Sequence, residues 1–143
     1  MPRRIPDLEA WVAASKERAL LRVLGIVGCA VGEGFAEYRI TPTAASSDGR
    51  RSVASFATTI AADMGVLAAA TTTLDTDLEE NNGTAELSMT FVGRPVGAVT
   101  VRCEVASAGP QMRVVLATAR DERGSVVAHG RGTYAVRQRR VAT

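Results

Sequence analysis

Asp63 is the residue with the clearest potential for chemistry. It is the only acidic residue in Ser52–Ala70, a stretch in which every other side chain is apolar, small or hydroxylic. Burying a carboxylate in such surroundings is energetically unfavourable unless it is paired with another group, so an unpaired one indicates a functional role. It can take a proton from water as a general base, or attack a carbonyl carbon as a nucleophile. The sequence leaves both roles open, together with a structural role in which Asp63 hydrogen-bonds to neighbouring backbone.

The other residues that commonly do chemistry are few. His129 is the only histidine, and it lies in a stretch expected to form the last strand, so we expect a packed or surface residue there. Cys29 and Cys103 lack the spacing of metal ligands and both lie in apolar stretches. We therefore expect two buried thiols, with neither a disulfide nor a metal site.

Length and composition indicate one ordinary globular domain over residues 1–143. Apolar residues make up 46% of the chain and charged residues 22%, as in soluble proteins. The net charge of +2 and the aromatic content of 4% do not favour a nucleic-acid-binding surface. No apolar run of about 18 residues is present and no secretory core follows Met1, so the expected location is the cytoplasm.

Two helices are expected to position Asp63 and its surroundings. Apolar residues recur at helical spacing over Leu8–Leu24, and Asp7 is placed to cap that helix. The stretch 52–70 is apolar on nearly every side, which is typical of a helix in the middle of a domain, and Ser52 is its expected cap.

Strands are expected on both sides of the central helix. Gly25–Gly34 is a short apolar strand or loop, and Phe35–Thr41 alternates as a half-exposed strand does. Residues 84–137 contain four segments of period two separated by glycine-rich turns. The pattern predicts an α+β fold in which a curved antiparallel sheet, arranged as a meander, wraps around one long helix.

Three patterns along the chain also occur together in a known family. An acid lies in the buried helix at Asp63, an aromatic residue and a proline end the strand Glu86–Pro95, and Gly124–Thr133 reads Gly-x-x-x-Ala-x-Gly-x-x-Thr. With these patterns the chain resembles the hotdog-fold acyl-CoA thioesterases, and in particular their PaaI-like branch, over most of its length. One motif departs from the family: Ala54-Ser55-Phe56 stands where the family has His-Gly-Gly, nine residues before the acid.

The resemblance implies hydrolysis of an acyl-CoA thioester, with coenzyme A as part of the substrate and no other cofactor. It implies that Asp63 activates water or attacks the thioester, and that the backbone N–H of Ser55 holds the oxyanion. Thr84 falls where some relatives have a serine that positions water, although a simple strand residue is an equal alternative. Arg94 and Arg131 are candidates for contacts with the phosphates of coenzyme A, or else exposed arginines at strand ends.

Helix geometry adds a statement about assembly. Ser55 and Asp63 are eight residues apart, or about 12 Å along one helix at about 1.5 Å per residue. They cannot both reach one carbonyl group, so a working site must combine Ser55 of one chain with Asp63 of another. The resemblance implies the same arrangement, with sites at the interface of a homodimer and dimers that often pair into homotetramers.

A second function remains open from the sequence. Because His-Gly-Gly is replaced, the chain could be a non-catalytic hotdog protein that binds an acyl-CoA or an acyl-carrier thioester. The small and apolar residues near the expected pocket do not separate aromatic from aliphatic acyl groups.

Overall fold

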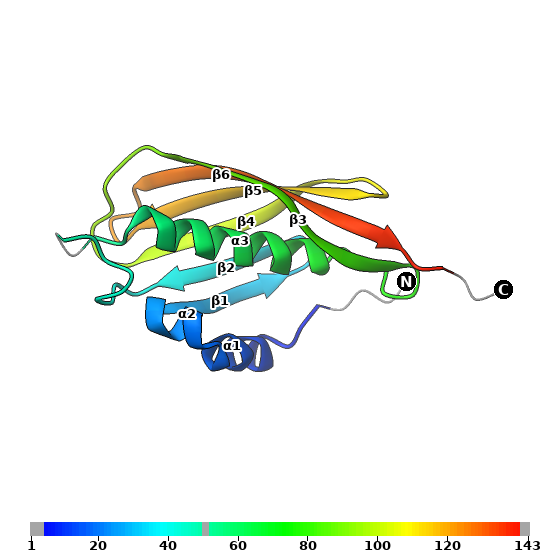
Figure 1. Cartoon of the computed structure of the whole chain (residues 1–143), viewed down its shortest axis with the longest axis horizontal. Helices are drawn as coiled ribbons and strands as arrows, with labels where there is room; N and C mark the ends of the chain where they lie inside the picture. Colours follow the sequence, from blue (N-terminus) through cyan, green and yellow to red (C-terminus); the bar gives the residue numbers. More distant parts are fainter. Residues whose placement is uncertain (1–4, 50–51, 141–143) are drawn as a thin grey trace.

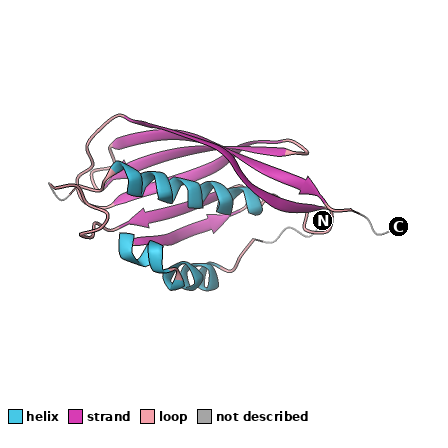
Figure 2. Ribbon diagram, in the orientation of Figure 1, coloured by secondary structure: helices cyan, strands magenta, loops and turns pink. Residues whose placement is uncertain are grey.

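A computed structural model describes residues 5–49 and 52–140, so residues 1–4 of the expected N-terminal region lie outside the described part. One long helix lies along a curved antiparallel sheet, and two short helices lie beside the edge of that sheet (Figures 1 and 2). The predicted arrangement of a sheet around a central helix is confirmed.

The central helix α3 (Ser55–Thr71) is buried because its side chains are small enough to let the sheet approach closely. A Cβ on Gly65 would lie 2.5 Å from Cys103 Sγ, and one on Gly132 would lie 2.5 Å from a methyl group of Val66. Both glycines are therefore required by contact between helix and sheet. This packing holds α3, and with it Asp63, at a defined height above the strands.

The sheet contains six strands in the order β1-β2-β4-β5-β6-β3. Their bounds are β1 (Ile26–Gly32), β2 (Phe35–Ile40), β3 (Glu79–Phe91), β4 (Val99–Ala108), β5 (Met112–Asp121) and β6 (Val126–Gln138). The expectation of a simple meander is wrong, because β3 pairs with β6 at the far edge and β4 pairs with β2. As a result β3 is an edge strand of 13 residues that has one neighbour.

Strand β3 also begins earlier than expected, at Glu79 rather than at residue 84. Its pairing with β6 shifts between Asn81 and Gly83 and again between Thr84 and Glu86. Gly83 has a positive φ of 93°, which suits a glycine at such an irregularity. Asn81, Asn82 and Gly83, which precede the segment expected to begin at residue 84, therefore lie within the strand at a β-bulge.

The N-terminal helix is divided in two, which corrects the prediction of one helix. Arg18 is extended (φ −75°, ψ 117°) and separates α1 (Leu8–Glu17) from α2 (Ala19–Leu24). The break lets α1 pack on β1 while α2 places Leu21 and Leu24 in the core. Asp7 caps α1 as predicted, because its carboxylate accepts a hydrogen bond from Ala10 N–H.

Two smaller predictions fail for local reasons. Ser52 does not cap α3: Ala54 is the N-cap, and the Ser52 N–H and C=O bond instead to Asp48 in the preceding loop. Cys103 is buried as expected, but Cys29 is exposed because it is the extra residue at a shift in the pairing of β1 with β2. Of the described helices, none is long and apolar enough to cross a membrane.

Candidate active site

Asp63 lies in the middle of α3 and faces β3. Its Oδ1 atom accepts a hydrogen bond of 2.9 Å from the Thr84 hydroxyl, so the structure brings these two predicted residues together. Within residues 5–49 and 52–140 no other hydrogen bond to the Asp63 carboxylate is formed, which leaves Oδ2 open. One oxygen of the carboxylate is therefore held by the strand while the other is available to a ligand or a water molecule.

The space beside this carboxylate, called here the Asp63 pocket, is mostly apolar. It has a volume of about 520 Å³, and Asp63 and Arg18 are the charged residues in its lining. The remaining lining comes from Leu20 and Leu21 of α2, Thr59, Ile60 and Met64 of α3, and Leu87 of β3. Asp63 is partly buried and Arg18 is exposed, so the pocket places one negative and one positive charge within reach of a bound group.

The pKa values of two side chains beneath α3 are affected by the Asp63 charge. Burial, and then the nearby Asp63 carboxylate, raises the pKa of Cys103 to about 12. Burial and the same carboxylate also raise the pKa of Tyr134. Both groups are therefore protonated at neutral pH, so neither supplies a thiolate or phenolate that would compete with Asp63 as a base.

The N-terminus of α3 is the second place where predicted site residues lie. Ser55 is the first helical residue, and within the described chain its N–H and that of Phe56 have no hydrogen-bond partner. Unpaired N–H groups at a helix N-terminus favour negative charge. The preceding loop is held by Ser46, which is fully buried and whose carbonyl accepts from Ala54 N–H at 2.7 Å.

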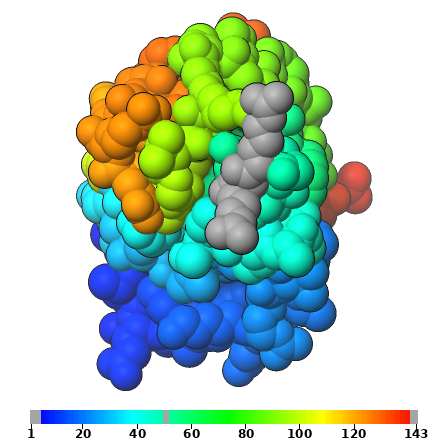
Figure 3. Space-filling model, turned by 90° about the vertical axis from the view of Figure 1, so that its left-hand side faces the viewer, coloured from blue at the N-terminus to red at the C-terminus, as the bar shows by residue number. Residues whose placement is uncertain are grey.

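A pocket of about 380 Å³ opens at this end of the molecule, and we call it the Ser55 pocket. It is lined by Ser55, Thr58 and Arg94 together with Asp48, Val53, Ala54, Phe91, Gly93, Pro95 and Val127. Figure 3 views the end where the segment leading into α3 lies beside the connection between β3 and β4. The structure thus brings the predicted residue Arg94 to the same pocket as Ser55.

The β3–β4 connection is anchored by Asp121 at the end of β5. Its carboxylate accepts hydrogen bonds from the N–H groups of Val96, Arg123 and Ser125, and pairs with the Arg123 guanidinium at 2.8 Å. The Arg123 guanidinium, ahead of the three N–H donors, lowers the pKa of Asp121 to about 2. This clamp keeps one wall of the Ser55 pocket in place.

Solved structures similar to this chain include three informative ones. A thioesterase from Haemophilus influenzae superposes with a TM-score of 0.84 at 17% identity, over 95% of this chain and 94% of its own. A mutant thioesterase from Pseudomonas aeruginosa gives 0.83 at 19%, over 96% and 98%. The PaaI protein of the phenylacetic acid degradation operon of E. coli gives 0.70 at 19%, over 94% and 97%. No protein-family model and no curated protein sequence matches the chain.

The chain has the hotdog fold. The superpositions cover nearly the whole chain, which confirms the predicted fold class, while the low identities limit the likeness to the fold.

Within one hotdog chain the two halves of the candidate site lie apart. The Asp63 pocket and the Ser55 pocket have no lining residue in common. Both residues lie on the same straight helix, about 12 Å apart along its axis. A single chain therefore has the carboxylate in one pocket and the free N–H groups in another.

Two predicted residues are not brought to either pocket. Arg131 lies on β6 next to Gly132, which contacts Val66 of α3, so Arg131 points to the opposite face of the sheet. Its guanidinium bonds to Glu86 at 3.3 Å. His129 is exposed on the same face of β6, in agreement with the expectation of a surface residue. A contact between Arg131 and coenzyme A stays a prediction.

Sequence reasoning missed Arg18 as a residue of the site. It was counted within one amphipathic helix, where a charged residue normally faces solvent. The break in the helix at Arg18 directs its guanidinium toward α3, with Nη1 3.9 Å from Met64 Sδ. No local pattern in the sequence announces this break, because it depends on how α1 and α2 pack on the rest of the fold.

Proposed function

We propose that the protein hydrolyses an acyl-CoA thioester. The observation that carries the proposal is the Asp63 carboxylate in an apolar pocket, with one oxygen held by Thr84 and the other free. Its support is the combination of that carboxylate with unpaired N–H groups at the start of the same helix, since thioester hydrolysis needs both an activator of water and a site for an oxyanion.

Asp63 can act in either of two balanced ways. As a general base it takes a proton from water while the oxygen attacks the thioester carbon; the C–S bond then breaks and the thiolate is protonated. As a nucleophile its oxygen attacks that carbon directly and releases the thiolate, and water then hydrolyses the mixed anhydride. In both routes the Thr84 hydroxyl keeps the carboxylate aimed toward the pocket.

The oxyanion would be held by the N–H of Ser55 from a second copy of the chain. A backbone donor does not depend on the side chain, so the change from glycine to serine keeps it. The fractional dipole of a 17-residue helix adds to this stabilisation. Arg94, in the Ser55 pocket, would then lie where it can contact a phosphate of coenzyme A.

A homodimer is the assembly that supplies both halves. Strand β3 is a long edge strand, and an exposed edge of this kind readily pairs with another strand. Pairing of β3 with β3 of a second chain about a two-fold axis would extend the sheet and bring the two α3 helices side by side. Apolar side chains that are half exposed nearby, such as Phe56 and Phe91, would be covered.

The proposal is tested by hydrolysis of a panel of aryl-, short-chain and long-chain acyl-CoAs. We expect turnover by the wild-type protein and a loss of about 100- to 10,000-fold in Asp63→Asn. Asp77→Asn, which changes an exposed acid in the turn before β3, is the matched control and should keep full activity. Binding of acyl-CoAs without turnover by the wild type would overturn the enzyme and favour a non-catalytic binder.

A further inference from the structure

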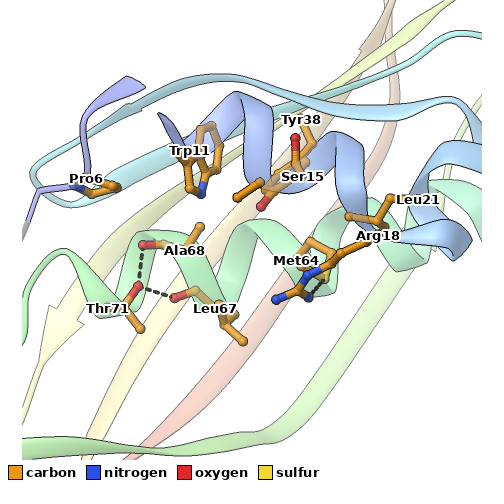
Figure 4. A pocket seen from close by; sticks show the side chains of 11 residues that line it. Pro6, Trp11, Ser15, Arg18, Leu21, Tyr38, Met64, Leu67, Ala68 and Thr71 are labelled. Atoms are coloured by element: carbon orange, nitrogen blue, oxygen red, sulfur yellow. Dashed lines mark hydrogen bonds between the residues drawn. The ribbon is translucent and has the colours of Figure 1, made fainter. Parts of the chain in front are cut away.

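A third cavity lies between α1 and α3, and we call it the Trp11 pocket (Figure 4). Its volume is about 230 Å³. Trp11 is fixed there by packing, because its ring lies over Gly28 and meets the Tyr38 ring edge-on at 5.0 Å. A Cβ on Gly28 would lie 2.6 Å from the indole, so the glycine is what allows this placement.

Three hydrogen-bond donors of the Trp11 pocket have no oxygen or nitrogen acceptor within the described chain. They are the indole N–H of Trp11, the hydroxyl of Tyr38 and the guanidinium of Arg18, which contacts the weak acceptor Met64 Sδ. Tyr38 is only 2% exposed. In the described part of the chain, every side-chain oxygen or nitrogen atom that is fully shielded from solvent has a hydrogen-bond partner. Because the Tyr38 hydroxyl has no partner, it must be accessible, and we infer that it opens into the cavity that Tyr38 lines.

Within the described chain, no oxygen or nitrogen atom of the remaining lining accepts a hydrogen bond from these donors. Four apolar side chains, Leu21, Met64, Leu67 and Ala68, form much of the wall, and no acidic residue is part of it. The two other hydroxyls donate elsewhere, Ser15 to the Val12 carbonyl and Thr71 to the carbonyls of Leu67 and Ala68, and Ser15 Oγ accepts from Gly28 N–H. One cation and two neutral donors facing an apolar wall fit a small anion that carries several oxygen acceptors.

The Trp11 pocket adjoins the Asp63 pocket. Both are lined by Arg18, Leu21 and Met64, and along α3 the lining passes from Asp63 to Ala68, a step of about 7.5 Å. The boundary is formed by the unbranched side chain of Met64, which adapts its shape easily. A group attached to a carbonyl at Asp63 can thus reach the donors of the Trp11 pocket.

A purely apolar acyl group fits this arrangement poorly. It would remove water from the buried Tyr38 hydroxyl and the partly buried Trp11 indole without offering them an acceptor, which is unfavourable for both donors, and it would leave the exposed Arg18 guanidinium without an anion. A carboxylate at the end of the acyl group satisfies all three.

We propose that the Trp11 pocket binds a carboxylate at the far end of the acyl group, so that the substrates are monothioesters of straight-chain dicarboxylic acids. This inference rests on the proposed thioesterase function and adds the substrate class. Trp11, Tyr38 and Arg18 bind the carboxylate, while Asp63 acts at the other end of the same acyl group.

The experiment compares pairs of CoA thioesters that differ only at the acyl end: succinyl with butanoyl, adipoyl with hexanoyl, and suberoyl with octanoyl. We expect the wild type to prefer the carboxylated member of at least one pair. Arg18→Met should lower that preference, measured as the ratio of kcat/KM values, about 10- to 100-fold, and Tyr38→Phe about 5-fold. Arg22→Met, an exposed arginine of α2 outside both pockets, is the control and should leave the ratio unchanged.

The outcomes separate this inference from the proposed function. If the wild type hydrolyses the apolar members as well as the carboxylated ones, the dicarboxylate assignment is wrong and the thioesterase stands. If no thioester is hydrolysed, the thioesterase is wrong, and the pocket is then judged by binding. Calorimetric titration of Asp63→Asn with adipoyl-CoA and hexanoyl-CoA needs no turnover, and equal affinities there would overturn the inference.

A phosphate of coenzyme A is another anion that Arg18 could meet. N-acetylcysteamine thioesters of the same acids carry no phosphate and distinguish the two sources. If the Arg18→Met effect persists with adipoyl-N-acetylcysteamine, the acyl carboxylate is the ligand. If the variant weakens every CoA thioester and no N-acetylcysteamine thioester, Arg18 binds phosphate and the proposal is overturned.

Discussion

The middle and the N-terminus of α3 differ in what they offer a substrate. In the middle, a single carboxylate lies in an apolar pocket and is oriented by a strand side chain, Thr84. At the N-terminus, free backbone N–H groups lie in a pocket whose walls are loops held by Ser46 and Asp121. One region can supply negative charge or a base, and the other can stabilise negative charge.

One helix therefore carries a carboxylate and a set of free N–H groups that it cannot bring to the same bound group. Their separation of about 12 Å is set by the helix and does not change with side-chain rotation. Complementary halves on a rigid element become a site when a second copy is placed antiparallel to the first. Activity is therefore expected to be a property of the assembly, and the following variants break one half at a time.

Ser55→Pro has the largest expected effect at the N-terminal half. Proline suits the first position of a helix, and Ala54 before it is already extended (φ −71°, ψ 149°), so the substitution removes one N–H and preserves the fold. We expect kcat to fall about 100- to 1,000-fold, as for loss of an oxyanion donor. Ser55→Ala keeps the N–H and should stay within a few-fold of wild type in the same assay.

Mixing two inactive variants tests whether the halves come from different chains. In an equal mixture of Ser55→Pro and Asp63→Asn chains, half of the dimers carry one complete site of two, so activity should return to about a quarter of wild type. Chains must first be exchanged by mild unfolding and refolding. No recovery in mixtures shown by mass spectrometry to contain mixed dimers would contradict a site shared between chains.

Thr84→Val has a smaller expected effect, in the middle of α3. Valine keeps the shape of threonine but removes the hydroxyl that holds Asp63 Oδ1. Loss of one hydrogen bond to a charged group should lower kcat about 10-fold with little change in KM. Thr84→Ser should restore most of the loss, and Thr90→Val, an exposed change on the same strand, should have no effect.

The sequence was most informative where the pattern was local. A helix apolar on nearly every side with one acid in it could only be central, and the structure confirms that position for α3. Thr84 was a candidate only through the family resemblance, as a residue that positions water or as a simple strand residue; the structure shows that its hydroxyl donates to Asp63, and the water-positioning role stays a prediction. In both cases the relevant residues lie within about 20 positions of one another.

The sequence was least informative where distant segments meet. The pairing of β3 with β6 joins residues about 50 positions apart, and period-two alternation is the same whichever strand is the neighbour. The contact of Trp11 with Tyr38 and the turn of Arg18 toward Met64 likewise depend on how α1 packs across the sheet. Those contacts create the Trp11 pocket, so it could not be predicted before the fold was known.

The smallest expected effect is a loss of stability in the loops that form the walls of the Ser55 pocket, and it is expected only at acidic pH. Because the pKa of Asp121 is lowered from 3.8 to about 2, its ionised form stabilises the folded protein above 3.8, and that contribution is lost as the pH falls toward 2. Asp121→Asn should lack this part of the acid-induced loss of stability, measured by urea unfolding between pH 5 and pH 2. In the wild type, the Val96 N–H donates a hydrogen bond to the Asp121 carboxylate, so this amide should lose its protection from hydrogen exchange over the same pH range. Amides in the middle of α3 should keep their protection. An identical acid dependence in wild type and variant would show that the clamp does not hold this end of the molecule.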